Sequence, residues 1–488
     1  MPTQGAQPEK ILEIRGEDWF KGLSYQSGLP YGGIFQSATN FDPFGAVGRM
    51  KPTTTPVQDT GTPVASNIRY MASGQESGTN YIYSWADTGG TPSLWRTNLN
   101  TGATTDQSST ITATSSSARG LIVYGGYLIY ARETEIKSVI LPGLGTNEQI
   151  LTTGVTTGLE HVFTIGADLN IYFTNGNSIG KLINGTGFRN AGIASNSATY
   201  FSLEAGMTIR HLVNDGRYLV IIADNAGAST AGGKVNCMIG FWDYTSTTLT
   251  QRFDFQETGL VGGVFMDGAI YVFGKNYLYV TNISTFPKSI FSFTTGSTIT
   301  TAPTSPAQIS QQGNSILWAS GTGIYGYGSL ISGSKKIFYN PYTFPASVTA
   351  FMSMILAGGL FVYGGTTGSK LYNTLSGSTA IASIVTSQVP LPQPFRFDWA
   401  KIVTRLPLSS GESITFSVNS QAGVGAITGD STFSYANQSE KQTYIFGPSG
   451  GGSAKKYFEE FYMTLLSNTS IERIELWGTR LDSKQQEL

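Results

Sequence analysis

A short hydrophobic segment returns seven times along the chain, and this repeat constrains the fold more than any other feature. Each copy is typical of a β-strand, with sequences such as YIYS, LIYA and LVII. The copies begin at Tyr81, Leu128, Asn170, Leu219, Ala269, Ser315 and Leu360. Their mean spacing of about 46 residues matches the length of a four-stranded β-propeller blade.

Each repeat also contains enough neighbouring strands to complete such a blade. An apolar segment precedes the returning strand, as in GLIVYGG from Gly120, and a third segment follows it, as in EIKSVIL from Glu135. Between the first and returning strands lie turn residues, including the Gly pair at Gly125 and the sequence MDG from Met266. The sequence therefore predicts an all-β fold, with a seven-bladed β-propeller over residues 65–388.

Residues 1–64 form an arm that is rich in glycine and proline but also carries many aromatic side chains. So much apolar surface is costly to leave in water, at about 25 cal/mol per Å². Two alternatives stay open: the arm closes its own propeller by donating a strand, or it docks onto a neighbouring subunit. The residues predicted to make assembly contacts are Trp19, Tyr25, Tyr31, Phe35, Phe41 and Phe44.

Residues 389–488 form the third predicted part of the chain. The proline-rich string PLPQPF after Val389 is typical of a linker, because prolines lack the N–H that a strand ladder needs. Alternating segments such as FDWAKIVTRL, ESITFSVNS and IERIELWGTRL follow it. They predict a compact antiparallel β-sandwich.

Composition excludes several classes of function. Charged residues make up 12% of the 488 residues and the formal net charge is −1, without a Lys/Arg cluster that would bind nucleic acid electrostatically. No apolar run is long enough to span a membrane, and the N-terminus lacks the apolar region of a signal peptide, so we expect folding in the cytoplasm. The single cysteine, Cys237, excludes an internal disulfide and a thiolate-rich metal site.

Candidate catalytic motifs are weak. Ser84, Asp87, Gly89 and Trp95 resemble the Asp box of sialidase-like propellers, but the spacing from Ser84 to Gly89 is one residue too long. No series of arginines and carboxylates is evident on successive inner strands. A carboxylate pair for glycoside hydrolysis stays open, because such pairing is spatial. The candidates, which we interpret as solvated turn or rim residues, are Glu133, Glu135, Glu160, Asp168, Asp224 and Asp254.

The two histidines occupy similar places in adjacent predicted blades. His161 and His211 each fall in the first strand of a repeat, where they would face the central channel and could share a metal. Because no third ligand is evident, we interpret them as polar residues in a wet channel. No nucleophile-elbow signature accompanies them. The sequence thus predicts no catalytic, cofactor-binding or metal-binding residue.

Three segments, in combination with the seven repeats, resemble virion proteins of tailed bacteriophages. They are Gly22 to Pro52, which contains NFDPFG at Asn40 to Gly45, the stretch from Lys401 to Ile414, and the ending SIERIELWGTRL. In the proteins that they resemble, a β-propeller precedes a small β-sandwich. The resemblance implies a structural part of a phage tail, such as a nozzle, hub or adaptor, that is assembled in the host cytoplasm.

The sequence therefore predicts a non-enzymatic virion component that assembles with other virion proteins as a symmetric oligomer and that could contact the host surface. One alternative is a carbohydrate-binding, receptor-recognition protein, because aromatic faces stack on sugars and four tryptophans look exposed. These are Trp85, Trp95, Trp242 and Trp318. The other alternative is a propeller glycosidase.

Overall fold

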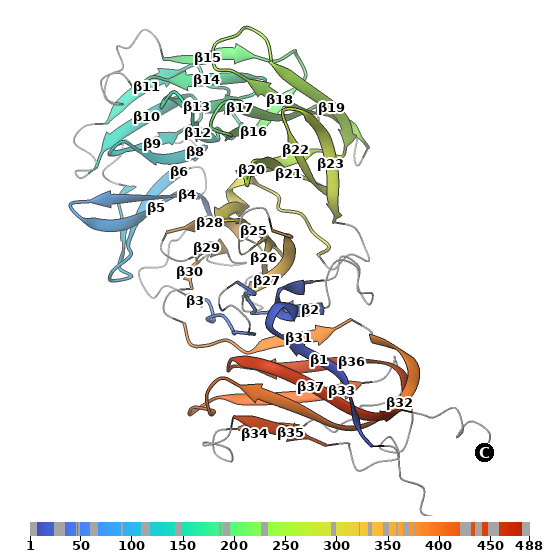
Figure 1. Cartoon of the computed structure of the whole chain (residues 1–488). Helices are drawn as coiled ribbons and strands as arrows, with labels where there is room; N and C mark the ends of the chain where they lie inside the picture. The colour runs from blue at the N-terminus through green and yellow to red at the C-terminus, as the bar shows by residue number, and fades with distance from the viewer. Residues whose placement is uncertain are drawn as a thin grey trace, which may run out of the picture.

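The structure is a computed structural model of the whole chain (Figure 1). It describes residues 7–23, 35–44, 46, 49–58, 67–88, 91–108, 118–141, 148–184, 188, 196–225, 233–293, 299–321, 323–329, 334–344, 351–357, 360–364, 370–374, 377–387, 389–419, 431–434, 442–447 and 458–480. In these residues the regular elements are β-strands and two short 3-10 helices, η1 (Gly16–Lys21) and η4 (Pro306–Gln308). The predicted all-β class is confirmed.

Seven four-stranded antiparallel sheets occupy most of the described chain. The first six consist of consecutive strands: β4 (Asn67–Glu76), β5 (Thr79–Thr88), β6 (Thr91–Asn98), β7 (Thr104–Asp106); β8 (Gly120–Tyr124), β9 (Tyr127–Ala131), β10 (Glu135–Ile140), β11 (Gln149–Thr153); β12 (Phe163–Ile165), β13 (Ile171–Asn175), β14 (Ser178–Leu182), β15 (Ser197–Ser202); β16 (Thr208–Asn214), β17 (Leu219–Asp224), β18 (Val235–Trp242), β19 (Gln251–Glu257); β20 (Leu260–Met266), β21 (Ala269–Gly274), β22 (Tyr277–Asn282), β23 (Thr285–Ser292); β24 (Ile309–Gln312), β25 (Ser315–Ser320), β26 (Gly323–Gly328) and β27 (Ile337–Thr343). The returning segment of the sequence is the second strand of each sheet.

The first strands of the sheets contact one another around a closed circle, from β4 through β8, β12, β16, β20 and β24 to β28 (Phe351–Leu356) and back to β4 (Figure 1). Neighbouring sheets pack through fully buried aromatic side chains, as where Trp85 meets Tyr130 with ring centroids 5.2 Å apart. The predicted glycine turns are present between first and second strands. Gly125 and Gly268 have φ of 59° and 75°, a conformation that favours glycine. The arrangement is propeller-like.

The seventh sheet takes its outermost strand from the N-terminal arm. Its strands are β28, β29 (Leu360–Gly364), β30 (Lys370–Asn373) and β3 (Val57–Gln58), and Val57 lies opposite Asn373. The Thr54 hydroxyl donates to the Thr374 carbonyl at 2.7 Å just before this strand. Of the two alternatives for the arm, the structure has the one in which the arm donates a strand within its own chain.

A second group of nine strands contains most of the C-terminal region and two more strands of the arm. One path runs β1-β37-β32-β36-β31-β2, and β33, β34 and β35 pair beside it. The strands are β1 (Glu9–Arg15), β2 (Phe35–Thr39), β31 (Ala382–Thr386), β32 (Val389–Thr404), β33 (Ser413–Asn419), β34 (Ser431–Ser434), β35 (Thr443–Phe446), β36 (Phe458–Ser467) and β37 (Ile471–Arg480). The arm thus lies at both ends of this path.

The expectation of a linker at PLPQPF is wrong, because these residues belong to strand β32. Val389 and Pro390 lie opposite β36, the register then shifts, and Phe395 resumes the pairing. The prolines alternate at positions 390, 392 and 394. In an extended strand, every second N–H points to the same edge, so the missing donors all fall on one side of the strand. A strand can therefore continue through this sequence.

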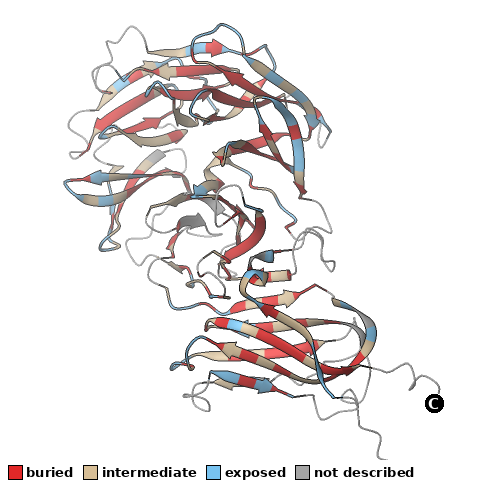
Figure 2. Cartoon of the chain, viewed as in Figure 1, coloured by how far each residue is buried: buried red, intermediate tan, exposed pale blue. Residues whose placement is uncertain are grey.

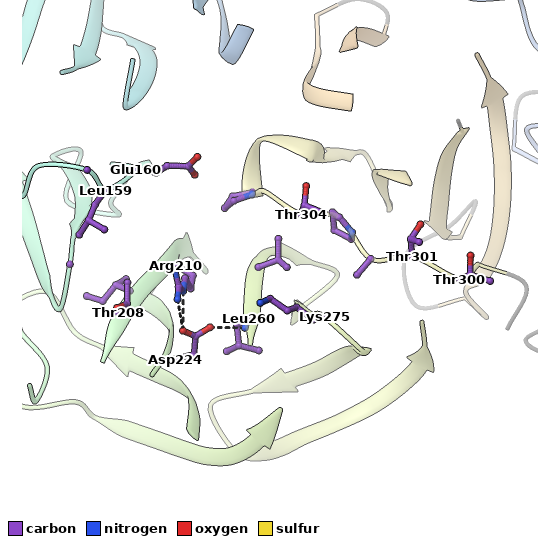
Figure 3. A pocket seen from close by; sticks show the side chains of 17 residues that line it. Leu159, Glu160, Thr208, Arg210, Asp224, Leu260, Lys275, Thr300, Thr301 and Thr304 are labelled. Carbon is purple, nitrogen blue, oxygen red and sulfur yellow. Dashed lines mark hydrogen bonds and ion pairs between the residues drawn. The ribbon is translucent and has the colours of Figure 1, made fainter. Parts of the chain in front are cut away.

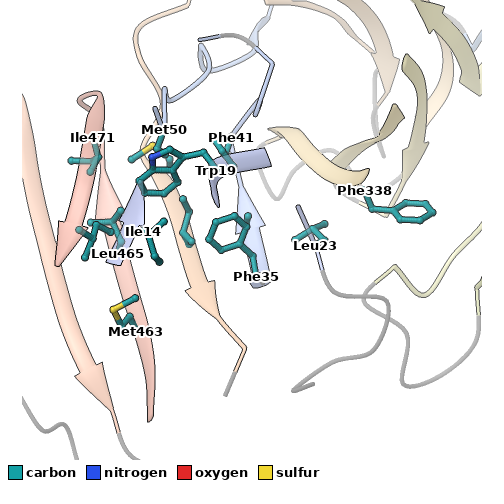
Figure 4. Close-up of a cluster of buried hydrophobic side chains, with 14 of the residues drawn as sticks. Ile14, Trp19, Leu23, Phe35, Phe41, Met50, Phe338, Met463, Leu465 and Ile471 are labelled. Atoms are coloured by element: carbon teal, nitrogen blue, oxygen red, sulfur yellow. The ribbon is translucent and has the colours of Figure 1, made fainter. Parts of the chain in front are cut away.

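The arm is held to the rest of the chain by a buried aromatic cluster. Trp19 and Phe35 are fully buried, and Phe41 is 1% exposed. Their ring centroids lie 6.2 to 6.4 Å apart. Figure 4 shows these three aromatic side chains between two parts of the chain. On one side are the C-terminal strands that carry Leu465 and Ile471, and on the other is the part of the circle of sheets that carries Phe338. Figure 2 shows that buried residues follow the strands through both parts of the molecule.

The NFDPF motif fastens the arm with hydrogen bonds. Asn40 has φ of 55° and bridges two parts of the chain: its amide donates to the Ile381 carbonyl at 3.1 Å, and its oxygen accepts from the Thr343 N–H at 2.8 Å. The Asp42 carboxylate accepts from the Phe44 N–H at 2.9 Å, which closes an Asx turn. The motif therefore has a structural role in this chain.

Candidate functional site

Bulges at the start of the first strands determine which side chains surround the channel. In β4, β16, β20 and β28, the register with the second strand skips one residue near the beginning. The skipped residue is Arg69 in β4, Arg210 in β16 and Val261 in β20. Because a bulge bends the strand, it can redirect the side chain of the extra residue. The bulged position therefore recurs in several sheets, and it holds an arginine in β4 and β16 but a valine in β20.

Two arginines at the start of inner strands form ion pairs with carboxylates at the end of the second strand or just after it. Arg210 donates Nε at 3.0 Å and Nη2 at 2.8 Å to Asp224, which is 1% exposed and also accepts the Leu260 N–H at 2.7 Å. Arg119, just before β8, pairs likewise with Glu133. Arg69 in β4, Arg119 just before β8 and Arg210 in β16 thus place arginines at the start of three of the seven inner strands.

The backbone register shows that Arg69 and Arg210 occupy equivalent positions, which the sequence could have revealed. Asn67 lies opposite Asp87 in the first sheet, as Thr208 lies opposite Asp224 in the fourth. The strand starts NIRY and TIRH, and the strand ends WAD and IAD, are therefore equivalent. Asp87, which suggested an Asp box, lies within strand β5, at the register position that Asp224 has in β17.

A cavity of about 780 Å³ opens at one end of the channel (Figure 3). Charged and hydroxyl side chains contribute to its wall, from the third, fourth and fifth sheets and from the segment before β24. They are Glu160, Thr208, Arg210, Asp224, Lys275, Thr300, Thr301 and Thr304. Among the described residues, no carboxylate lies within 4 Å of the Lys275 ammonium group. Lys275 is therefore a cation at the cavity wall that forms no ion pair with a described residue, and the Asp224 carboxylate is the acidic group on its side of the cavity.

The segment that precedes β24 crosses the channel behind this cavity. Helix η4 lies against β4, β20 and β28. The Ser305 hydroxyl accepts from the Ala307 N–H at 3.3 Å, and the Gln308 side chain accepts from the Thr304 N–H at 2.6 Å. These local hydrogen bonds stabilise a compact turn. It separates the large cavity from a smaller one deeper in the channel.

The smaller cavity, about 180 Å³, has both histidines in its wall, as the sequence predicted. His161 Nδ1 donates to the Thr174 carbonyl at 2.7 Å, so Nε2 is the unprotonated nitrogen, and it has no hydrogen-bond partner among the described residues. His211 Nδ1 accepts the Gly263 N–H at 3.2 Å. Burial lowers the pKa of His161 and lowers that of His211 to about 4, so both are neutral at pH 7.

Within the described ranges, no group of three His, Cys, Asp or Glu side chains is placed to hold a metal ion. Several carboxylates that the sequence singled out are in structural bonds. Asp168 accepts from the Tyr172 hydroxyl at 2.7 Å, and Asp254 pairs with Arg252 at 2.8 Å. Glu135 pairs with Lys137 at 3.2 Å. They are not gathered at the cavity, where the structure places Glu160 and Asp224.

The four tryptophans that suggested a sugar-binding surface are buried. Trp85 and Trp318 are fully buried, Trp242 is 1% exposed and Trp95 is 7% exposed. Trp95 packs near Leu371, across the junction of the first and last sheets. The expectation that they are exposed is wrong, because large aromatic side chains on strands supply the packing between sheets.

The six predicted assembly residues have different positions. Trp19, Phe35 and Phe41 are in the chain's own core, and a contact with another subunit would require the arm to leave it. Phe44 is half-buried and packs edge-on against Tyr339 with centroids 5.1 Å apart. Tyr25 and Tyr31 lie outside the described residues.

Comparisons with known proteins give structural likeness alone. No protein-family model and no curated protein matches the sequence. A structure titled YCF48 bound to D1 peptide aligns at 10% identity and a TM-score of 0.43, over 72% of this chain and 98% of that one. Hydrazine synthase of Kuenenia stuttgartiensis aligns at 12% identity and 0.43, over 65% of this chain and 99% of that one. At these scores no function is transferred. Across the described ranges, no helix has the length and apolar character to cross a membrane.

Proposed function

We propose that the chain is a non-enzymatic structural component of a tailed-phage particle, located in the tail. In this proposal the seven sheets are the blades of a seven-bladed propeller over residues 65–388, closed by β3. Residues 389–488, together with strand β31 and the arm strands β1 and β2, form a β-sandwich. The proposal rests on the resemblance of the N-terminal and C-terminal segments to virion proteins and on one structural observation.

That observation is the course of the arm, which pairs with both parts of the molecule. β1 pairs with β37, β2 with β31 and β3 with β30. Between β2 and β3, Met50 exchanges two backbone hydrogen bonds with Ile471, at 2.9 and 3.0 Å. An arm that is hydrogen-bonded to both parts restrains their relative movement. Such a restraint suits a building block that must hold its shape in a symmetric assembly.

Particle composition tests the proposal directly. Particles are purified from the host that carries the gene, and antibodies against the recombinant protein are used for immunogold electron microscopy, with antibodies to the major capsid protein as the reference. We expect label on the tail and none on the head. Complete, infectious tails that lack the protein would overturn the proposal.

A cysteine pair tests whether the arm stays on its own chain in the particle. Met50 and Ile471 form a hydrogen-bonded antiparallel pair, for which a Cα separation of about 5.5 Å is usual and is compatible with a disulfide. Met50→Cys with Ile471→Cys should oxidise within one chain and run as a monomer on a non-reducing gel. The single variants are the controls. Covalent dimers or ladders from assembled particles would instead show that the arm is exchanged between subunits.

A further inference from the structure

The charged side chains of the large cavity differ in how many hydrogen bonds they already form within the protein. Asp224 is buried and accepts bonds on both carboxylate oxygens, from Arg210 and from the Leu260 N–H. Arg210 uses Nε and Nη2 for this pair, and its side chain remains 34% exposed at the cavity wall. Its guanidinium is thus held in one orientation, with Nη1 not engaged by Asp224. Such a fixed guanidinium is suited to an acceptor in the cavity.

Lys275 supplies the second cation. It follows β21, and its backbone N–H donates to the Gly259 carbonyl at 3.0 Å. Gly259 has φ of 143°, and a Cβ there would lie 3.2 Å from Lys275 Cε. Glycine therefore leaves space for the lysine stem beside the cavity. A larger residue at 259 would displace the stem and strain the backbone.

The facing part of the wall has the opposite character. Figure 3 shows Glu160 and Thr304 across the cavity from Arg210 and Lys275. Glu160 is exposed, and its carboxylate can accept hydrogen bonds from ligand hydroxyls. Leu260, Val261 and Pro306 add apolar surface between these groups. The volume of about 780 Å³ is within the range of small-molecule sites.

We infer that this cavity binds a sugar acid, with its carboxylate toward Lys275 and Arg210 and its hydroxyls toward Glu160. Lys275 and Glu160 carry opposite charges and Arg210 is balanced by Asp224, so the site as a whole is close to neutral. A monoanion with several hydroxyl donors complements this arrangement. A compact dianion such as phosphate is disfavoured, because the site as a whole is close to neutral and the Glu160 carboxylate would repel it. The inference rests on the cavity alone and does not depend on the proposed role in a particle.

Binding is measured by isothermal titration calorimetry and saturation-transfer NMR on the full chain. The probes are methyl glucuronide and N-acetylneuraminic acid, the methyl esters of both, methyl glucoside and inorganic phosphate. We expect both esters and the neutral glucoside to bind at least about tenfold more weakly than the acids, because each loses a charge-assisted hydrogen bond. Equal binding of acid and ester, or stronger binding of phosphate, would overturn the inference, as would the absence of binding of either acid at millimolar concentration.

Variants assign the binding to this cavity. Lys275→Gln removes the exposed cation and should weaken acid binding about tenfold. Lys288→Gln is the matched control, since Lys288 is an exposed lysine on the outermost strand of the same sheet. The double variant Arg210→Gln with Asp224→Asn removes the ion pair without leaving a buried charge. Unchanged affinity in the Lys275 variant, with circular dichroism like that of the parent, would refute the site.

Discussion

Replacing Trp19 by alanine tests whether the arm is an integral part of the C-terminal group of strands. The Trp19 side chain is fully buried, stacks on Phe35 with centroids 6.3 Å apart and meets Phe41 edge-on. Its indole N–H donates to the Glu472 carbonyl, on strand β37, at 3.2 Å. The substitution therefore removes both an aromatic anchor and a link to a strand that pairs with the arm.

The expected loss of stability follows from these contacts. Truncating a buried tryptophan to alanine costs about 3 to 5 kcal/mol, which includes the cavity that is left. The unpaired Glu472 carbonyl adds about 1 kcal/mol if water does not reach it. For a cooperative unit of about 150 to 250 residues, each kcal/mol lowers Tm by roughly 2 to 4 °C. We therefore expect the Tm of the unfolding transition that involves β37 to fall by roughly 6 to 24 °C.

Hydrogen exchange locates the effect. In Trp19→Ala, amides of β37 and β1 should lose protection, whereas amides of the distant sheet β16–β19 should keep it. Trp19→Phe retains an aromatic ring and should lose less, and Phe286→Ala, at a position 56% exposed, should change the free energy of unfolding by less than about 0.5 kcal/mol. If Trp19→Ala behaves like Phe286→Ala, the indole is not buried against β37 and the arm is not packed on its own chain.

Three further predictions concern other parts of the structure. Asn40→Ala removes two hydrogen bonds and places alanine at φ of 55°, so urea unfolding should show a loss of about 2 to 3 kcal/mol, and Asn40→Gly should lose less. The pKa of His211 falls to about 4 on folding, so below pH 6.5 the unfolded chain binds a proton that the folded chain excludes. The free energy of unfolding should therefore decline between pH 6.5 and 4, by at most about 1.4 kcal/mol per pH unit. Thermal melts of His211→Gln should show a shallower decline over the same range. Cys237 is fully buried and burial raises the pKa of its thiol to about 12, so a thiol reagent should label it at the rate of opening, and rapid labelling at pH 7 without denaturant would contradict its placement.

The strands and turns of the ring could be predicted because their signals are local. Tyr81 and the six later starts fall in or beside the second strands, and glycines such as Gly125 mark turns that need positive φ. The closing strand could not be predicted, because Val57 and Asn373 lie far apart in the sequence. Two residues of strand carry no periodicity that would identify a partner.

The candidate site was harder to predict, because its geometry depends on bulges. Arg69 and Arg210 belong to ordinary alternating strands in the sequence, and the register alone shows that each is an extra residue. The signal that could have revealed them is that I-R near the start of the first strand and A-D at the end of the second strand recur in the first and fourth repeats. Exposure of Trp242 or Trp318 could not be judged either, since a strand has two faces and both can be buried between sheets.

Closure by β3 also links the stability of the ring to that of the C-terminal strands. The seam between the last and first sheets is covered by Trp95 and Leu371, and the outer edge of the last sheet is formed by the arm. The same arm supplies β1 and β2 at the ends of the C-terminal path. Displacement of the arm would therefore expose an unpaired edge on β30, on β31 and on β37. A destabilising substitution in the arm should thus lower the stability of both parts of the molecule. A substitution in an outer strand such as β19 should destabilise its own sheet alone.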